Sequence, residues 1–310
     1  MSTSAHTSPK VNVLLSTYNG AAYLPAQLDS IFAQQDANLL IHVRDDGSSD
    51  NTVEMLQQYD MQHENLVVRA EANLGVIKSF FDLLQQADDT CKYFAFCDQD
   101  DVWVNTKMAN AVELLEQESD DVPLLYFCRL EYVDQQLNHI GYGPIPRRLG
   151  FGNALVQNLA TGCTVVINRK ARDMILSQLP RRAMMHDWWA YLVASAYGKV
   201  VYDNRIGIKY RQHGGNEVGG TPIFSESMKR RFKRFVNHGK HVFMVSEQAI
   251  EFVRCFGDSL PAKQRNMAAR FLASKKNFFA RLRYAFSMDV WRNTVIDHFI
   301  LRIMILIDRY

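Results

Sequence analysis

The first hundred residues alternate short apolar runs with segments of helical spacing, and this alternation constrains the fold more than any other feature. The strand-like runs are Lys10–Ser16, Leu39–Val43, Leu66–Arg69 and Tyr93–Cys97. The helical segments between them are Leu24–Gln34, Thr52–Tyr59 and Val76–Gln86. Strand, turn and helix repeated in this order predict an α/β fold with a mostly parallel sheet and right-handed crossovers. The fully apolar run Tyr93–Cys97 is predicted to be a central strand.

The pattern loosens after Asp101, and the rest of the chain is predicted in larger pieces. We expect helices at Lys107–Gln117 and Trp188–Tyr197, strands at Leu124–Tyr132 and Thr164–Asn168, and a loop at Gly141–Gly152. From Ser225 onward the sequence favours helices, with a break at Pro261. These patterns predict a flexible tail at 1–9, an α/β domain at 10–221 and a basic helical region at 222–310.

Polar residues follow each predicted strand of the first half. They are Ser16 and Tyr18, then Asp45 and Asp46, then Asn73, and finally Asp98 and Asp100. Ligands of open parallel sheets bind outside the carboxyl ends of the strands, so we expect these side chains to form one site. No glycine-rich phosphate loop follows any of these strands, so an acidic nucleotide site here would need a metal ion to hold a diphosphate.

The cluster Asp98-Gln99-Asp100-Asp101 is the centre of that predicted site. Carboxylates two residues apart at a strand end can divide their roles between a ribose hydroxyl and a divalent cation, and Mg²⁺ or Mn²⁺ prefers such oxygen ligands. The alternative is a solvated turn that caps the following segment. The run Asp45-Asp46-Gly47-Ser48 also has two interpretations: ordinary turn chemistry, in which Asp50 caps a helix, or a carboxylate that accepts the ring N–H of uracil or thymine.

Two later motifs add candidates. Asp187, in His186-Asp187-Trp188-Trp189, is either a helix cap or a general base flanked by aromatic faces. A helix terminus lowers the pKa of such a carboxylate, while burial against indoles raises it, and the sequence leaves the balance open. His213 precedes Gly214 and Gly215, which permit a close backbone approach, so His213 is a candidate for a metal or phosphate contact.

Together these motifs resemble family-two inverting glycosyltransferases of the GT-A fold, in particular the bacterial rhamnosyltransferase branch. The residues that carry the resemblance are Leu15–Gly20, Arg44–Asp50, Asn73–Gly75, Phe96–Trp103, Thr161–Cys163, His186-Asp187 and Gln212–Gly214. They occur in the family's order and cover about residues 10–217. The family often has Glu-Asp where this chain has His186-Asp187. The chain departs from that pattern at His186 but keeps Asp187, the carboxylate expected to be the base.

The resemblance implies a role for each matching position. Ser16, Tyr18, Asp46 and Asn73 would hold the nucleoside, and Asp98 would meet the ribose or assist the metal. Asp100 would bind the Mg²⁺ or Mn²⁺ that bridges the diphosphate. Asp187 would deprotonate the acceptor hydroxyl.

The same resemblance suggests substrates. The donor would be dTDP-rhamnose, and the acceptor a saccharide or polyprenyl-linked saccharide of a bacterial surface polysaccharide. The rival enzyme, a sugar nucleotidyltransferase, would carry a glycine-rich basic loop where Ser16–Asn19 stands. The rival without activity is a nucleotide-sugar-binding scaffold, and the presence of Asp100 and Asp187 argues against it.

Charge is divided unevenly along the chain. Residues 222–310 carry 17 Lys and Arg against 7 Asp and Glu, whereas residues 1–221 carry 18 against 26. The segments Met228–Val236, Phe271–Phe286 and Trp291–Ile307 mix cations with large apolar residues, which is typical of helices that lie on a membrane surface. The alternative is that these helices pack on the catalytic domain with solvated basic faces. No nucleic-acid motif is present, so we expect no nucleic-acid partner.

The sequence contains neither a stretch typical of a membrane-spanning helix nor a cysteine pattern typical of disulfide bonds. Phe299–Ile307, the most apolar stretch, is interrupted by Arg302 and is far shorter than the ~20 residues of a spanning helix. The five cysteines form no CxxC pair and several lie in apolar runs, which predicts buried free thiols in a reducing compartment. We therefore expect a cytoplasmic protein, either soluble or lying on the inner face of the cell membrane.

Overall fold

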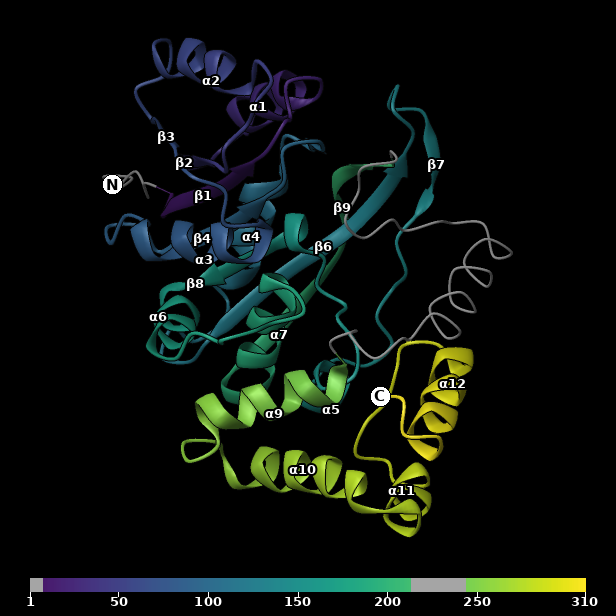
Figure 1. Cartoon of the computed structure of the whole chain (residues 1–310). Helices are drawn as coiled ribbons and strands as arrows, with labels where there is room; N and C mark the ends of the chain where they lie inside the picture. Colours follow the sequence, from purple (N-terminus) through teal and green to yellow (C-terminus); the bar gives the residue numbers. More distant parts are fainter. Residues whose placement is uncertain (1–7, 213–243) are drawn as a thin grey trace, which may run out of the picture.

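Nine strands pair into one sheet in the computed structural model, which describes residues 8–212 and 244–310 (Figure 1). The strands are β1 (Lys10–Thr17), β2 (Asn38–Asp45), β3 (Leu66–Ala70), β4 (Tyr93–Cys97), β5 (Val102–Trp103), β6 (Leu124–Val133), β7 (His139–Tyr142), β8 (Val165–Asn168) and β9 (Lys199–Arg211). The first four pair in parallel in the order β3-β2-β1-β4, which confirms the predicted α/β class. Beyond β4, strand β8 runs antiparallel to β4 and β6, and β6 pairs in parallel with β9.

Helices cover both faces of this sheet. In chain order, the helices of the described residues are α1 (Leu24–Phe32), α2 (Thr52–Asp60), α3 (Val76–Gln86), α4 (Lys107–Leu115), α5 (Phe151–Ala154), α6 (Arg169–Ser177), α7 (His186–Tyr197), α9 (Val245–Phe256), α10 (Ala262–Ala273), α11 (Phe278–Ala285) and α12 (Val295–Leu306). Helices α10 to α12 pack on other helices rather than on the sheet. The described residues also contain two 3-10 turns, η1 (Gly162–Thr164) and η2 (Ser274–Lys276). The predicted helices and strands of the first hundred residues are thus confirmed, with shifts of a few residues at their ends.

Strand β1 shows how the sequence separates the two layers of the core. Val11, Val13 and Leu15 point into the layer that α1, α2 and α4 cover, whereas Leu14 points into the layer that α3 covers. This alternation follows from the two-residue period of a strand. All five residues of β4 are fully buried, so the prediction of a central strand is confirmed.

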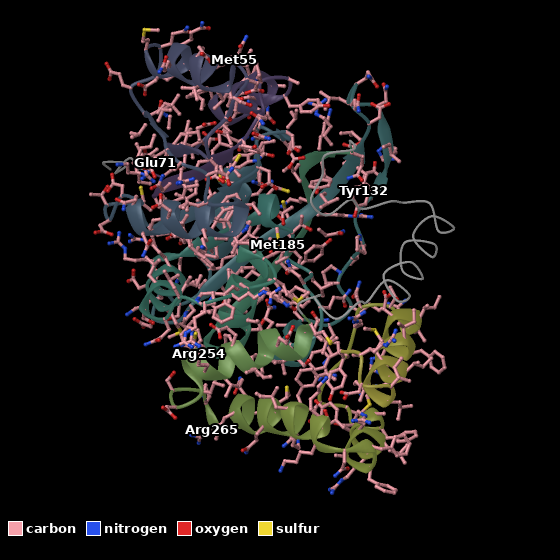
Figure 2. The ribbon with its side chains drawn as sticks, in the orientation of Figure 1. Met55, Glu71, Tyr132, Met185, Arg254 and Arg265 are labelled. Atoms are coloured by element: carbon pink, nitrogen blue, oxygen red, sulfur yellow. The ribbon has the colours of Figure 1, made fainter. Side chains whose placement is uncertain are left out.

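The described C-terminal helices share a core with the sheet. Trp189 of α7 packs edge-on against Phe252 of α9 with ring centroids 5.4 Å apart. Phe271 of α10, Leu301 of α12 and the last residue, Tyr310, belong to the same buried cluster. In Figure 2 the labelled Met185, just before α7, lies at the centre of the molecule, and Arg254 and Arg265 mark α9 and α10.

Some sequence expectations have a different outcome. The ends of the predicted loop Gly141–Gly152 are ordered, as the end of β7 and the start of α5. The long strand β9 was not predicted, because its exposed half carries polar residues that break the apolar pattern. The five cysteines are free thiols, as predicted. Four expectations lie wholly or mainly outside the described residues: the tail at 1–9, His213, the basic run at 228–236 and the domain boundary at 221–222.

Candidate active site

The loops that follow β1, β2 and β4 are hydrogen-bonded to one another at the carboxyl edge of the sheet. Asn19 N donates to Ser48 Oγ (2.8 Å), and Ser49 N donates to Asn19 Oδ1 (2.8 Å). On the other side, Tyr18 N donates to Gln99 Oε1 (2.8 Å) and Gln99 Nε2 donates to Tyr18 O (3.0 Å). These three loops therefore constrain one another directly.

Asp45 organises the loop after β2. Its Oδ1 accepts a hydrogen bond from Ser48 N (2.8 Å), and its Oδ2 accepts one from Thr17 Oγ1 (2.9 Å) on β1. Asp50 accepts from Thr52 N (3.1 Å), but the N-cap residue of α2 is Asn51, so the expectation that Asp50 is the helix cap is wrong. These bonds are the turn chemistry expected of an Asp-Asp-Gly-Ser sequence.

Asp46 and Asn73, both predicted to hold the nucleoside, lie in contact. Their hydrogen bonds join the loop after β2 to the loop after β3. The carboxylate of Asp46 accepts from Leu74 N (2.7 Å) and Gly75 N (2.8 Å) and is paired with Arg44. Asn73 Nδ2 donates to the Asp46 carbonyl (2.8 Å). Because the Asp46 side chain is buried and both its oxygens are engaged, the structure gives it a positioning role, and its direct contact with a nucleoside stays a prediction.

Ser16 and Tyr18 flank the same edge in different environments. Ser16 Oγ lies 2.7 Å from Ser79 Oγ on α3, which fixes its side chain. The Tyr18 ring is exposed, while its backbone is held by Gln99. An aromatic ring that is exposed on a fixed backbone is suited to stacking on a flat ligand.

Three side chains lie close together just after the carboxyl end of β4: those of Asp98, Asp101 and Cys163. Their potential ligand atoms all lie within 4.8 Å of one another. Asp101 is fully buried; its Oδ1 accepts from Arg211 N (3.0 Å), and no N–H or O–H donor of the described residues reaches its Oδ2. The Cys163 thiol bonds to the same carboxylate and lowers its pKa, although burial and the neighbouring acids outweigh that effect. A buried carboxylate oxygen without such a donor, close to a second carboxylate, fits a divalent cation.

Electrostatics supports that interpretation. Burial, followed by the charges of Asp100 and Asp187, raises the pKa of Asp98 to about 7. The pKa of Asp101 is also raised well above its usual value, by burial and by the charges of Asp100 and Asp98. Carboxylates that raise one another's pKa in this way are stabilised in their charged form by a cation.

Asp100 is the residue that the sequence motif predicts to bind the metal, whereas the motif predicts no role for Asp101 or Cys163. Asp100 lies close enough for its charge to act on Asp98 and Asp101, while the atoms brought together belong to Asp98, Asp101 and Cys163. The signal was present in part, because Asp101 closes the acidic run and Cys163 belongs to the Thr161–Cys163 motif. Only the antiparallel pairing of β8 with β4 places the η1 turn beside the acids.

Lys107 is a second residue that the sequence did not single out. It is fully buried at the start of α4, its Nζ donates to the Cys163 carbonyl (2.8 Å), and it lies 3.3 Å from the centroid of the Trp103 ring. Its positive charge lowers the pKa of Asp98, although burial and the neighbouring acids outweigh it. Lys107 therefore supplies a fixed internal counter-charge beside the acidic cluster.

Asp187 lies in the first turn of α7, where Met185 rather than Asp187 is the N-cap residue. Its Oδ1 accepts from Trp188 N (2.6 Å), and further hydrogen bonds reach the carboxylate from Gly162 N and the Asn158 side chain. Burial outweighs these bonds and raises the pKa of Asp187 to about 6. The balance that the sequence left open is thus resolved in favour of desolvation, in the range useful for a general base.

His186 is buried beside Asp187: a Cβ on Gly162 would lie 3.1 Å from His186 Nε2 and 3.4 Å from Asp187 Oδ2. The His186 ring stacks on Phe80 with centroids 3.8 Å apart and meets Phe96 edge-on at 4.9 Å. Neither ring nitrogen has a hydrogen-bond partner among the described residues, and burial lowers the pKa of His186 to about 3. His186 is therefore a neutral packing residue that supports the start of α7.

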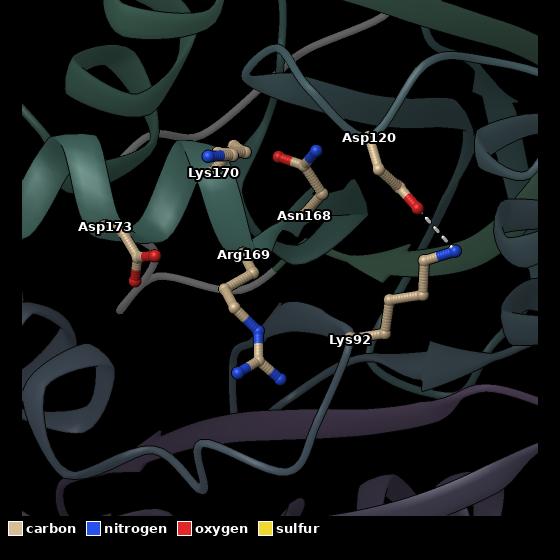
Figure 3. Close-up of a pocket in the computed structure, with 6 residues that line it drawn as sticks. All are labelled: Lys92, Asp120, Asn168, Arg169, Lys170 and Asp173. Atoms are coloured by element: carbon tan, nitrogen blue, oxygen red, sulfur yellow. Dashed lines mark ion pairs between the residues drawn. The ribbon is translucent and has the colours of Figure 1, made fainter.

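A pocket at the opposite edge of the sheet is separate from this site (Figure 3). It is lined by Lys92, Asp120, Asn168, Arg169, Lys170 and Asp173. Lys92 precedes β4 and Asn168 ends the antiparallel β8, so the pocket lies at the amino end of β4, away from Asp98. Lys92 is paired there with Asp120 (2.7 Å), which neutralises part of its charge.

The family model described as glycosyl transferase family 2 matches residues 12–172 of the chain. The chain is 28% identical over 235 residues to the dTDP-rhamnosyl transferase RfbG of Shigella flexneri, covering 70% of this chain and 77% of that protein. It is 26% identical over 160 residues to the UDP-Glc:alpha-D-GlcNAc-diphosphoundecaprenol beta-1,3-glucosyltransferase WfgD of Escherichia coli, covering 51% and 60%.

Two solved structures share the fold. The chain matches S. aureus TarS 1–349 in complex with UDP-GlcNAc at a TM-score of 0.54 and 17% identity, over 97% of this chain and 89% of that one. It matches the mannosyltransferase PcManGT of Pyrobaculum calidifontis, in complex with GDP-Man and Mn²⁺, at a TM-score of 0.54 and 16% identity, over 97% and 81%. The chain spans 46% of the longer TarS chain. These likenesses confirm the GT-A fold that the sequence motifs implied.

Proposed function

Because the chain belongs to glycosyl transferase family 2, we propose that it is a metal-dependent inverting enzyme that moves L-rhamnose from dTDP-rhamnose. The acceptor would be a saccharide or a lipid-linked saccharide of a bacterial surface polysaccharide. The similarity to RfbG supports the donor, and the similarity to WfgD supports a lipid-linked acceptor. The observation that carries the proposal is the gathering of Asp98, Asp101 and Asp187 at the carboxyl end of β4.

The metal-binding part of the proposal rests on the acidic cluster. Asp98 and Asp101, with Asp100 beside them, would hold Mg²⁺ or Mn²⁺, and His213 remains a candidate from the sequence. The buried Oδ2 of Asp101 supports this assignment, and hard cations prefer such oxygens. When bound, the cation supplies positive charge that offsets the charge developing on the leaving diphosphate.

Asp187 is the proposed general base. Trp188 N–H and Gly162 N–H hold its carboxylate at the start of α7, and burial keeps its pKa near 6. At neutral pH the ionised carboxylate would accept the proton of the acceptor hydroxyl while that oxygen attacks the anomeric carbon. Base catalysis of this kind contributes roughly 10²–10⁴-fold to the rate. Because the base acts on the face opposite the leaving group, the configuration of the sugar would invert.

The nucleoside would lie across the loops after β1 and β2. The exposed Tyr18 ring offers a stacking surface, and Ser16 and Asn73 offer polar contacts along the same edge. Asp98 would meet the ribose. Asp46 supports this surface by holding the turn that contains Asn73, and a contact between Asp46 and the base remains part of the proposal.

The first test is calorimetric titration of the full chain with dTDP-rhamnose, UDP-sugars and GDP-sugars, each with and without Mg²⁺ or Mn²⁺. We expect metal-dependent binding of dTDP-rhamnose that is lost in Asp100→Ala and Asp101→Asn. Asp173→Asn, an exposed position on α6, serves as the matched control and should bind normally. Preference for a UDP- or GDP-sugar would replace the donor assignment but keep the enzyme class.

A second measurement separates an enzyme from a binding scaffold. Donor hydrolysis in the presence of the metal should be detectable for the wild type and lost in Asp187→Asn, which still binds the donor. Binding without any turnover in the wild type, with or without saccharide acceptors, would favour the inactive scaffold. No binding of any donor by a folded chain would overturn the proposed function.

A further inference from the structure

The C-terminal helices α11 and α12 carry an unusual concentration of exposed apolar side chains. Ten of the eighteen large apolar side chains exposed in the described residues fall between positions 278 and 307. They are Phe278, Phe279, Leu282, Phe286, Met288, Val295, Ile296, Phe299, Ile303 and Ile307. We call this set the apolar ridge. Scattered exposed apolar residues are normal on a protein surface, but a contiguous group of this kind marks an interaction site.

The ridge follows from the helical period. Val295, Phe299 and Ile303 recur every fourth residue and so lie on one face of α12, whereas Leu301 and Ile305 on the other face are fully buried. Helix α11 repeats the arrangement, with Phe278 and Leu282 outside and Tyr284 inside. The two helices pack against each other at the edge of the molecule (Figure 1, yellow), so the exposed apolar residues of both lie in the same part of the molecule.

The charge beside the ridge is positive. Residues 274–310 contain seven Lys and Arg but only three Asp and no Glu. Each of the three acids is already engaged: Asp289 by Arg270 (2.7 Å), Asp308 by Lys275 (2.8 Å) and Asp297 by the Thr294 hydroxyl. The exposed cations Lys276 and Arg283 have no ion pair within the part of the chain that the structure describes. A partner for this surface must therefore be apolar and negatively charged.

We propose that the apolar ridge docks on an anionic lipid bilayer, with Phe279, Phe286 and Phe299 entering the boundary between headgroups and acyl chains. These three rings are 77%, 81% and 65% exposed. None of the described helices combines the length and apolarity needed to cross a membrane, so α11 and α12 would lie along its surface. Lys276 and Arg283 would meet the lipid phosphates. A second copy of the chain is a poorer occupant, because it would bring two basic rims together.

This docking surface is independent of the donor and acceptor proposed above, and it is tested without a nucleotide sugar. The full chain is sedimented with phosphatidylglycerol vesicles and with phosphatidylcholine vesicles, at 0.1 M and 0.5 M salt. We expect the wild type to bind the anionic vesicles preferentially and to retain part of that binding at 0.5 M salt. The high-salt arm matters because the basic run at 229–234 could also attract anionic lipid, and such attraction is screened by salt.

Two variants and one control assign the binding to the ridge. The triple variant F279S/F286S/F299S should bind phosphatidylglycerol vesicles at least ten-fold more weakly at 0.5 M salt, and K276E/R283E should weaken binding at 0.1 M salt. The control M61S/V67S/I140S removes exposed apolar side chains elsewhere and should bind as the wild type does. Circular dichroism and thermal melting confirm that each variant is folded.

Two results would overturn the proposal. The first is wild-type binding that the folded triple serine variant retains in full at both salt concentrations. The second is a wild type that ignores both vesicle types but forms a dimer in sedimentation velocity that the triple variant dissociates. That result would assign the ridge to a second copy of the chain.

Discussion

Gln99 and Tyr18 exchange two hydrogen bonds, from Tyr18 N to Gln99 Oε1 (2.8 Å) and from Gln99 Nε2 to Tyr18 O (3.0 Å). The side-chain amide of Gln99, in the loop after β4, thereby pairs with the backbone N–H and C=O of the loop after β1, as a neighbouring strand would. Gly20 makes room for it, since a Cβ at that position would lie 2.1 Å from Gln99 Oε1. The glycine of the Ser16–Gly20 motif is therefore explained by a contact with a loop about eighty residues away.

The first prediction concerns this pair. Gln99→Ala should raise the KM for the donor about ten-fold, because Tyr18 loses its backbone restraint. Gly20→Ala should have nearly the same effect, since its methyl group displaces the Gln99 amide. The double variant should be no worse than either single variant, because both remove the same interaction. Steady-state kinetics on the four proteins completes the cycle.

The control for this cycle is Gln58→Ala, an exposed residue of α2, which should leave KM unchanged. Additive effects of the two single changes would show that Gly20 and Gln99 act separately. That outcome would remove the structural explanation for the glycine.

The second prediction concerns the buried ammonium of Lys107. Lys107→Met should lower the free energy of unfolding at pH 7 by about 3–5 kcal/mol, which is the usual cost of removing one of two oppositely charged groups that are buried together. The Cys163 carbonyl would lose its donor, and Asp98 would lose a nearby positive charge. Mn²⁺ should restore part of the stability by replacing that charge. Urea unfolding with and without the metal measures both effects.

Lys92→Met is the matched control. Lys92 is half-exposed and paired with Glu116 (2.7 Å) at the far edge of the sheet, so its loss should cost about 0–1 kcal/mol and show no response to Mn²⁺. If the Lys107 variant were as stable as the wild type, the role of Lys107 as counter-charge would be wrong.

Much of the fold was predictable because local patterns and tertiary packing agree. Strands β1 to β4 are short apolar runs, and the intervening helices keep one apolar face, so periodicity alone identifies them. Strand β9 was missed because it alternates irregularly and its apolar residues depend on pairing with β6, which comes more than sixty residues earlier. A single sequence carries no signal for such long-range pairing.

The residues of the candidate site also differ in whether a local sequence pattern or a long-range contact identifies them. Asp98, Asp100 and Asp187 stand out because carboxylates at a strand end or a helix start have few structural reasons to cluster. Asp101, Cys163 and Lys107 were missed because their importance comes from burial and from the neighbours that β8 and α4 bring to them. From the sequence, Lys107 is only the first residue of a predicted helix, and a lysine on a helix is usually exposed to solvent.

The third prediction is a pH effect on stability from His186. Its folded-state pKa of about 3 lies below the 6.5 of an ordinary histidine, so only the unfolded chain takes up a proton as pH falls below 6.5. The native state is therefore progressively destabilised, by about 2 kcal/mol at pH 5. His186→Phe keeps the ring stacked on Phe80 and removes this loss. Urea unfolding at pH 7.5 and pH 5 should show the variant gaining about 2 kcal/mol on the wild type between the two conditions.

An unchanged difference between variant and wild type at the two pH values would mean that His186 is protonated in the folded protein. Equal m-values for both proteins are required for the comparison, because a change in m would indicate a change in the unfolded state.

The last prediction joins activity and stability at Asp187. As the general base it must be ionised, so log kcat/KM for transfer should rise with pH and level off above an apparent pKa near 6. The folded-state pKa lies above the 3.8 of an ordinary aspartate, so at pH 7 the buried charge destabilises the fold, and this cost vanishes as pH falls below about 4. Asp187→Asn should therefore lower kcat by roughly 10²–10⁴-fold while raising the free energy of unfolding at pH 7 by up to about 3 kcal/mol. Donor binding should persist, because the amide oxygen can still accept from Trp188 N. A variant that is inactive but less stable than the wild type would show that Asp187 serves the start of α7 rather than the chemistry.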